Sequence, residues 1–252
     1  MARLQGLVSV ITGAGSGIGR ASALAFAAEG ACVVVADLDR GAAEETAASI
    51  GAQGGSASPL QVDVTDAAQV DAMLQHASER FGRLDVLFNN AGIPQGFTPV
   101  EESSDDLFER IMAVNVRGVF NGCRAAVPRM KAQGGGVILN TASTAGIRPR
   151  PGLAIYNASK AAVISLTKTL ALEVAQYRIR VVSICPVATD TPMLATFLGP
   201  DAEEARERFV ATVPWGRLNK PEDLARAAVF LASPEAEMVT GTAFEVDGGR
   251  DI

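Results

Sequence analysis

Histidine and cysteine are scarce in this 252-residue chain, and their scarcity excludes several kinds of catalytic centre. The chain has one histidine, His76, which is too few for a histidine-based metal cluster, and His76 lies on a helical surface pattern, so we expect no serine–histidine triad either. The three cysteines, Cys32, Cys123 and Cys185, are odd in number and far apart, and each lies in an apolar segment. We therefore expect reduced packing residues rather than disulfides, and no metal site.

An excess of positive charge and long apolar runs are also lacking. The 22 Lys and Arg against 28 Asp and Glu give a net charge of −6, and no basic cluster points to nucleic acid. No uncharged apolar run approaches the roughly 18 residues of a membrane span. The apolar stretch that follows the N-terminus is too short for a signal peptide. We expect a soluble cytoplasmic protein with neither nucleic-acid nor membrane partners.

Short apolar runs alternate with stretches of helical periodicity along the whole chain. Continuous apolar runs are expected where a parallel sheet is covered on both faces, and the stretches between them are long enough for crossover helices. We predict an α/β fold: a Rossmann-like, doubly wound parallel sheet of about seven strands flanked by helices, in one domain over residues 1–252. The predicted strands are Leu7–Ile11, Cys32–Ala36, Ser58–Val62, Leu84–Phe88, Gly136–Asn140, Arg178–Ile184 and Ala243–Val246.

A glycine-rich turn follows the first predicted strand. Gly13, Gly17 and Gly19 precede the helical pattern Arg20–Glu29, with three residues between the first two glycines. Glycines allow a sharp turn and close approach to a ligand, and a helix N-terminus offers free N–H groups to a phosphate. Such turns are common, but this one joins a strand to a helix and is followed by a second strand that leads into Asp37. That context predicts a nucleotide site.

Polar residues stand at the ends of the other predicted strands, where a doubly wound fold binds its ligands. Asp37 ends the second strand. Asp63 ends the third, and its carboxylate either binds an adenine or caps the helix that starts near Asp66. The fourth strand leads into Asn89–Gly92, which alone would predict only a turn, and the fifth into hydroxyls within Thr141–Thr144.

Asn115 lies at helical spacing in an apolar stripe that includes Ile111, Met112 and Val119. A buried amide must find hydrogen-bond partners. Asn115 either binds a carbonyl locally or holds a water in a site. The residues alone favour the first alternative.

Tyr156 and Lys160 share one face of a predicted helix, because they are four residues apart. A phenol has a pKa of about 10, too high for a base near neutral pH. A nearby ammonium favours the phenolate and would lower that pKa. The alternative is a partly buried tyrosine beside a solvated lysine.

These motifs together resemble the single-domain branch of the short-chain dehydrogenase/reductase family, of the Tyr-x-x-x-Lys type, over nearly the whole chain. Each motif is weak alone, but their order and spacing together are specific. The matching motifs are Thr12-Gly13-(x)₃-Gly17-Ile18-Gly19, Asn89-Asn90-Ala91-Gly92, Asn115, Ser143, Tyr156-(x)₃-Lys160, and Val239-Thr240-Gly241 to Asp247-Gly248-Gly249.

The resemblance implies four catalytic residues. Tyr156 would be the acid/base for the substrate oxygen, and Ser143 would hydrogen-bond that oxygen. Lys160 would hold the nicotinamide ribose and lower the tyrosine pKa, and Asn115 would anchor a water in a proton relay. The reaction implied is hydride transfer between the nicotinamide and a carbinol carbon of a small alcohol or ketone.

NAD is the expected cofactor. A carboxylate at Asp37 can accept hydrogen bonds from both adenine-ribose hydroxyls and would repel a 2′-phosphate, although it could instead cap the next helix. Ser16 and Leu38 offer no compensating cation, and Arg40 is expected to face solvent or pair with a neighbour such as Asp39. The expected cofactor-binding residues are Gly13, Ser16, Gly17, Ile18, Gly19, Asp37, Leu38, Asp63, Val64, Asn90, Ala91, Gly92, Tyr156, Lys160, Pro186, Thr189 and Thr191.

The sequence departs from the family pattern after the sixth strand. Where the family usually has Pro-Gly-x-x-x-Thr, Val187 follows Pro186, and we expect it to narrow the pocket wall. The apolar residues that follow either form a lid over the pocket or only pack small helices onto the body. A lid would favour a hydrophobic or moderately polar substrate over a phosphorylated one. These residues are Met193, Leu194, Phe197, Leu198, Phe209, Val213 and Trp215.

Three functions are compatible with these motifs. The first is an NAD-dependent dehydrogenase that interconverts a secondary alcohol and a ketone. The second is a 3-oxoacyl-thioester (acyl carrier protein) reductase, which normally goes with NADPH and a basic residue in the turn or after the second strand. Ser16 and Leu38 occupy those positions here, which counts against it. The third, a non-catalytic cofactor sensor, fits less well because the catalytic residues are all present.

A homotetramer is expected, mainly from the resemblance. The helices that hold Asn115 and Tyr156 carry more apolar residues than one face of a sheet requires, and pairing of helices across a two-fold axis would cover them. The apolar residues concerned are Val119, Phe120, Val163, Leu166, Leu170 and Leu172.

Overall fold

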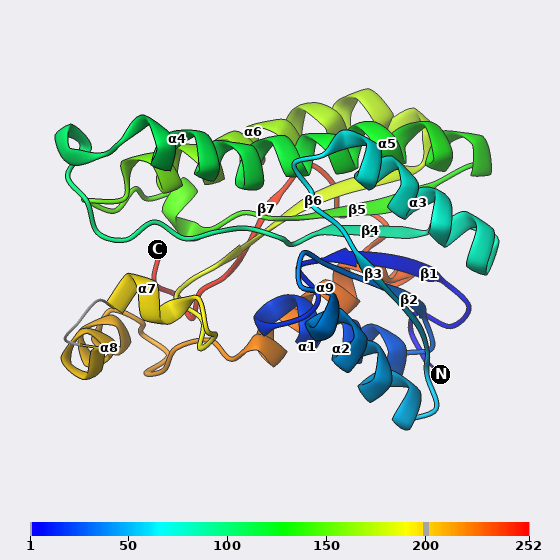
Figure 1. Ribbon diagram of the computed structural model, residues 1–252, viewed down its shortest axis with the longest axis horizontal. Coiled ribbons are helices and arrows are strands. Elements are labelled where there is room, and N and C mark those ends of the chain that lie inside the picture. Colours follow the sequence, from blue (N-terminus) through cyan, green and yellow to red (C-terminus); the bar gives the residue numbers. More distant parts are fainter. Residues whose placement is uncertain (1, 199–201, 252) are drawn as a thin grey trace.

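Seven parallel strands form one sheet in the computed structural model, which describes residues 2–198 and 202–251 (Figure 1). The strand order is β3-β2-β1-β4-β5-β6-β7, so the predicted fold class is confirmed. The strands are β1 Val8–Thr12, β2 Cys32–Asp37, β3 Ser56–Gln61, β4 Val86–Asn89, β5 Gly136–Thr141, β6 Ile179–Pro186 and β7 Ala243–Val246.

The helices lie in two layers, one on each face of the sheet. Figure 1 shows α3, α4, α5 and α6 over one face and α1, α2 and α9 over the other, with α7 and α8 to one side. The α-helices are α1 Gly17–Ala28, α2 Arg40–Ala52, α3 Ala67–Phe81, α4 Asp105–Met112, α5 Gly118–Gln133, α6 Ala154–Val174, α7 Leu194–Leu198, α8 Ala202–Ala211 and α9 Pro221–Ala232. Within these residues, no helix is both long enough and apolar enough to cross a membrane.

Both faces of the central strands are buried, which explains their continuous apolar runs. In β2, Val34 belongs to the core beneath α3, α5 and α6, whereas Val33 and Val35 belong to the core beneath α1 and α9. Successive side chains of a strand point to opposite faces, so each of these valines must be apolar. The same sheet brings all the carboxyl ends of its strands to one edge.

The predicted strand ends differ from the observed ones by at most two residues. Arg178 was predicted to begin the sixth strand, but its φ is 57°, in the left-handed region. A residue in that conformation cannot continue an extended strand, so β6 begins at Ile179.

The apolar residues from which we predicted an oligomer divide into two groups. Val119 and Val163 are buried in the core of their own chain, so their selection as interface residues was wrong. Leu166 and Leu170 are partly buried against the same core. Phe120 and Leu172 keep 45% and 85% of their surface exposed. Phe120 and Leu172 are therefore the most exposed of the six, while Leu166 and Leu170 keep part of their surface.

All three cysteines are free thiols. Cys123 and Cys185 are buried, and Cys32 is half-buried. Burial raises the pKa of the Cys123 thiol, and that of Cys185, to about 12. They are packing residues, as predicted.

Candidate active site

The chain reverses its direction across the sheet between β1 and β4. These strands are neighbours, but the connections that leave them run to opposite sides, β1 towards β2 and β4 towards β5. The loops after them meet closely, because a Cβ added to Gly13 would lie 2.9 Å from the Cα of Ala91. Ligands of doubly wound sheets bind in the crevice at such a point.

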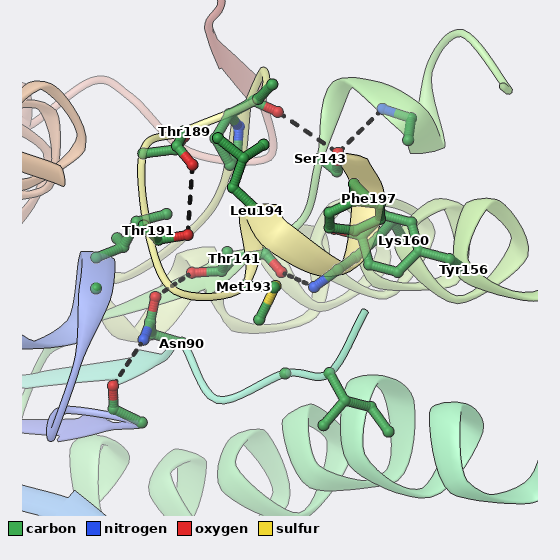
Figure 2. Close-up of a pocket in the computed structure, with 18 of the residues that line it drawn as sticks. Asn90, Thr141, Ser143, Tyr156, Lys160, Thr189, Thr191, Met193, Leu194 and Phe197 are labelled. Carbon is green, nitrogen blue, oxygen red and sulfur yellow. Dashed lines mark hydrogen bonds between the residues drawn. The ribbon is translucent and has the colours of Figure 1, made fainter. Parts of the chain in front are cut away.

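Asn90 joins the ends of three strands at this crevice. Its Nδ2 donates to the carbonyl oxygens of Thr12 and Gly13, at 3.0 and 3.3 Å. Its Oδ1 accepts a hydrogen bond from the Thr141 hydroxyl at 3.1 Å (Figure 2). The Thr12 hydroxyl accepts from the backbone N–H groups of Asn90 and Ala91. The loop after β4 is therefore held against the glycine turn.

The glycine turn has no room for side chains. Gly13 and Gly17 have φ values of 63° and 51°, which other residues rarely adopt. A Cβ on Gly19 would lie against the Gly13 carbonyl oxygen and 2.6 Å from Nδ2 of Asn90. The sequence motif allows any residue at position 15, but the structure requires glycine there, because an added Cβ would lie 2.6 Å from the Cβ of Ala42.

The N-terminus of α1 points its free N–H groups into this crevice. Within the described chain, the side chain of its N-cap residue Ser16 makes no capping hydrogen bond. Uncapped first-turn N–H groups together with the positive end of the helix dipole form an anion site.

Asp37 contacts the turn and does not cap α2. Its Oδ2 accepts from the N–H of Gly15 at 2.8 Å, and its Oδ1 accepts from the N–H of Asp39 at 3.0 Å. Asp39 is the N-cap of α2, with its carboxylate on the N–H of Ala42. Arg40 pairs with Glu44 at 2.7 Å on an exposed surface, so it pairs with an acidic neighbour as expected, although not with Asp39.

Asp63 does not cap the following helix either. Its Oδ1 accepts from the N–H and the hydroxyl of Thr65, at 2.8 and 2.7 Å. The cap of α3 is Asp66, which accepts from the N–H groups of Ala68 and Gln69. The capping alternative for Asp63 was therefore wrong, and its adenine contact stays a prediction.

A cavity of about 800 Å³ extends from the glycine turn past Tyr156 to α7 and α8. It lies in the size range of small-molecule sites. Of the predicted site residues, all except Gly19 and Asn115 line it. The sequence therefore selected residues at six strand ends, those of β1 to β6, that the fold does bring together. Figure 2 shows those that follow β4, β5 and β6.

Burial raises the pKa of Tyr156 to about 12, and a hydrogen bond with the Ser143 hydroxyl lowers it only in part. This differs from the expected lowering by Lys160, although the ammonium lies 5.6 Å from the centre of the tyrosine ring. Desolvation dominates because the apolar walls exclude water from the phenol. At neutral pH, Tyr156 therefore holds its proton.

Lys160 is buried and bound to the sheet. Its Nζ donates to the carbonyl oxygen of Thr141 at 2.9 Å (Figure 2). Burial lowers its pKa to about 8, while the Cys185 thiol acts in the opposite direction. An ammonium has three donors, so this one keeps donors for a ligand in the cavity.

Comparisons with known proteins agree with this geometry. The family described as "Enoyl-(Acyl carrier protein) reductase" matches residues 13–251. A 4-formylbenzenesulfonate dehydrogenase of Comamonas testosteroni is 42% identical over 246 residues, which cover 97% of this chain and 98% of that protein. A short-chain type dehydrogenase/reductase from Mycobacterium marinum has a crystal structure with a TM-score of 0.91 and 37% identity, covering 98% of this chain and 96% of that one.

The chain belongs to the short-chain dehydrogenase/reductase family. It is therefore an oxidoreductase with a Rossmann-like fold, as the motifs predicted. A 3-ketoacyl-(acyl-carrier-protein) reductase from Brucella melitensis, crystallised with NADH, is 47% identical to it. The TM-score is 0.93, and the match covers 99% of this chain and 100% of that one.

Asn115 of this short-chain dehydrogenase/reductase lies behind the cavity wall. It sits in a π-helical turn, Ala113–Arg117, between α4 and α5. Its Oδ1 accepts from the N–H of Ile93 at 2.8 Å, and its Nδ2 donates to the Ile93 carbonyl and the Ser159 hydroxyl, at 3.0 and 3.2 Å. The local alternative favoured by the residues alone is the one observed, and a role in a proton relay stays a prediction.

Gln95 is a positioning residue that the sequence motifs did not indicate. It is fully buried, and its Oε1 accepts from the N–H of Tyr156 at 2.9 Å. Leu153, at the N-cap of α6, offers no side-chain acceptor. Gln95 thus caps α6 from the loop after β4, and it fixes the turn that carries the phenol. No spacing rule connects the two residues.

The lid prediction is partly confirmed. Met193, Leu194, Phe197, Leu198 and Phe209 line the cavity, and the Phe197 ring meets that of Tyr156 edge-on at 5.3 Å (Figure 2). Two of the predicted lid residues do not line it: Val213, which is buried elsewhere, and Trp215, which is 74% exposed. Three arginines line the cavity as well, at positions 150, 208 and 250.

Val187 lines the cavity wall, and the narrowing expected from it stays a prediction. It is buried and lines the wall, next to Pro186, whose carbonyl oxygen accepts from the Ser143 hydroxyl at 3.5 Å. Among the described non-glycine residues, only Arg178 has a positive φ, so Val187 takes an ordinary backbone conformation. The Val187 side chain occupies space that a glycine at this position would leave open.

The close packing of the glycine turn predicts that a side chain at position 19 would destabilise the protein. Gly19→Ala should lower the free energy of unfolding by about 1–3 kcal/mol, because the added Cβ meets backbone that cannot move aside. Gly51→Ala is the control, since Gly51 lies in α2 with nothing within 4 Å of its Cβ position. Thermal melting checks this, with a fall of about 2–4 °C per kcal/mol. Equal melting temperatures for wild type and Gly19→Ala would contradict the packing.

Proposed function

We propose that the protein is an NAD(H)-dependent oxidoreductase that interconverts a secondary alcohol and a ketone, with residues 1–252 as one cofactor-binding domain. The observation that carries this proposal is the position of Tyr156. Its phenol shares one cavity with Ser143, Lys160 and the glycine turn. A proton donor beside a dinucleotide cradle is the arrangement that carbonyl reduction requires.

The residues present fit a nicotinamide dinucleotide. The uncapped N-terminus of α1 would hold the diphosphate, and Asp37 would accept from the adenine-ribose hydroxyls. Lys160, with Nζ donors to spare, would hold the nicotinamide ribose. When bound, the cofactor supplies or accepts the hydride at the carbinol carbon.

The chain supplies the proton and orients the substrate oxygen. Tyr156, whose pKa is about 12, is protonated at neutral pH and can donate to an oxygen that gains negative charge. The Ser143 hydroxyl would donate a second hydrogen bond to that oxygen. Phe197 and the apolar wall exclude water, which strengthens both interactions.

A second candidate function is reduction of a 3-oxoacyl thioester. The 3-ketoacyl-(acyl-carrier-protein) reductase from Brucella melitensis was crystallised with NADH, so use of NAD does not argue against this activity. An assay with NADH should compare simple aryl ketones with a neutral acetoacetyl thioester. Faster turnover of the thioester favours the second candidate, and no turnover of any carbonyl would leave only a cofactor-sensing role.

The catalytic role of the phenol can be tested directly. Tyr156→Phe keeps the ring and removes the transferable proton, so kcat should fall about 10²- to 10⁴-fold. NADH affinity should stay nearly intact. The chain has one other tyrosine, Tyr177, at the end of a 3₁₀ turn with Lys131 above its ring, and Tyr177→Phe is the matched control. Retention of most of the activity in Tyr156→Phe would refute the assignment.

Asp37 supports NAD over NADP. Each of its oxygens accepts one backbone N–H and keeps capacity for a ribose hydroxyl. A 2′-phosphate would meet this carboxylate, and the neighbouring Arg40 is already paired with Glu44. Leu38, which also lines the cavity, carries no charge.

The cofactor prediction is a preference for NAD of at least about tenfold in kcat/KM, or about 1.4 kcal/mol. Asp37→Ala should shrink this preference, chiefly by weakening NAD. Asp37→Asn keeps an acceptor for the N–H of Gly15 and removes the charge. This variant therefore separates the effect of the charge from that of the hydrogen bond to the turn. Steady-state kinetics with both cofactors check this, and a wild type that prefers NADP would show that the account of Asp37 is wrong.

We also infer a homotetramer. Phe120 on α5 and Leu172 on α6 are exposed apolar side chains on neighbouring helices of one layer, which a partner's helices would cover. The inference rests on these two residues and on family membership.

Light scattering should give the mass of four chains rather than the 26.1 kDa of one. The double variant Phe120→Asp/Leu172→Glu should lower that mass, because it places charge in an apolar contact. Met238→Glu, at an apolar residue that is 93% exposed and lies outside α5 and α6, is the control. A wild-type monomer at micromolar concentration would exclude the tetramer.

A further inference from the structure

The charged residues that line the cavity are separated by sign. The carboxylates among its described lining residues are Asp37, the last residue of β2, and Asp63, which follows β3. The arginines come from the opposite half of the sheet: Arg150 precedes α6, Arg208 lies in α8, and Arg250 follows β7. A ligand that spans the cavity therefore meets negative charge at one end and positive charge at the other.

Arg250 is half-buried and has no carboxylate within 4.0 Å in residues 2–198 and 202–251. Its guanidinium lies 5.4 Å from the centre of the Phe209 ring, so α8 covers it on one side. Burial lowers its pKa, and the charge of Arg150 lowers it further, while Asp251 and Asp247 oppose this. Two guanidinium groups are thus held near each other at the cavity wall.

Arg150 is fixed by an ion pair. Its guanidinium lies 2.9 Å from Oδ1 of Asp251, whose side chain is completely buried. Its carbonyl oxygen accepts from the side chain of Asn157, the residue after Tyr156, at 2.8 Å. Arg150 therefore lies at a fixed place near the phenol, with its charge largely balanced.

Glu245, Asp247 and Asp251 form an acidic group near Arg250, and Asp247 is engaged by backbone N–H donors. Asp247 accepts from the N–H groups of Gly249 and Asp251, at 3.0 and 2.8 Å, and so holds the turn that carries Arg250. Glu245 is exposed. Among the described residues, these contacts leave the Arg250 guanidinium without a direct ion pair, and they fix its backbone.

Arg208 adds a second available cation. It pairs with Glu204 at 3.3 Å on the surface of α8, with both side chains about two-thirds exposed. Such exposed pairs contribute little to stability, so an anion in the cavity can compete for Arg208. Glu204 itself does not line the cavity.

We propose that Arg250, assisted by Arg208, binds a singly charged oxyanion of the substrate, a carboxylate or a sulfonate. This inference rests on the proposed function. The anionic group is carried at the end of the substrate away from the reacting carbonyl, and its apolar body packs against Phe197 and Phe209. A guanidinium donates two parallel hydrogen bonds to such an oxyanion, and a desolvated guanidinium binds it more strongly.

A matched set of aryl ketones tests the proposal. Wild-type enzyme with NADH should reduce 4-acetylbenzoate with a kcat/KM at least about tenfold above that of its methyl ester and of 4-acetylbenzamide. In Arg250→Gln, this ratio of anionic to neutral substrate should fall about tenfold or more. A variant that is merely destabilised would lower both rates and keep the ratio.

The control is Arg80→Gln. Arg80 is exposed on α3, lies outside the cavity and has its guanidinium 5.4 Å from the Phe81 ring, the same separation as in the Arg250–Phe209 pair. The ratio should stay at the wild-type value in this variant. Arg250→Lys, which keeps the charge without the planar fork, should fall between wild type and Arg250→Gln.

Binding measured without turnover separates this proposal from the proposed function. Titration of 4-acetylbenzoate into the NADH complex should give a dissociation constant that rises about tenfold or more in Arg250→Gln. Such Arg250-dependent binding with no reduction would retain the anion site and refute the ketone reductase. Equal kcat/KM for the anion and its neutral analogues, or equal binding by wild type and Arg250→Gln, would overturn the anion site.

Discussion

The hydrogen bonds of Asn90 hold together the part of the molecule on which the site depends. They connect the ends of β1, β4 and β5 at the place where the chain reverses across the sheet. A parallel sheet gathers its strand ends at one edge, but it does not fix the loops that follow them. Here one amide closes the loop after β4 onto the glycine turn, and Thr141 connects that pair to Lys160. The cofactor cradle and the reacting groups therefore share one framework.

Burial in this framework moves two pKa values in opposite directions. It raises the pKa of Tyr156 to about 12 and lowers that of Lys160 to about 8, because an apolar environment favours the neutral form of each. The sequence argument weighed the attraction between an ammonium and a phenolate but not the loss of water around both. Under the proposed function, the protonated phenol is the form that would donate a proton in carbonyl reduction.

Much of the fold was predictable because burial on two faces leaves a simple pattern. Val33, Val34 and Val35 show this in β2, where each valine faces one core or the other. The contacts of Gln95 with Tyr156 and of Arg250 with Phe209 were not predictable. In each pair the residues come from segments far apart in the chain, and no local pattern connects one residue with the other. The prediction that Val119 and Val163 lie in an interface was wrong for a related reason. An apolar stripe in the sequence does not show whether the same chain or a partner chain covers it.

The two halves of the cavity are built in different ways. The glycine turn cannot accept even a Cβ at Gly15 or Gly19, so its shape permits few changes. The opposite wall consists of Val187, the side chains of α7 and α8, and the residues after β7, and α8 meets the residues after β7 where Phe209 contacts Arg250. Apart from Phe197, whose ring contacts Tyr156, a side chain of this wall can change without touching the phenol or the glycine turn. Under the proposed function, substrate choice would therefore depend on Val187, Phe209 and Arg250, and the reaction would depend on the residues that Asn90 and Gln95 hold in place.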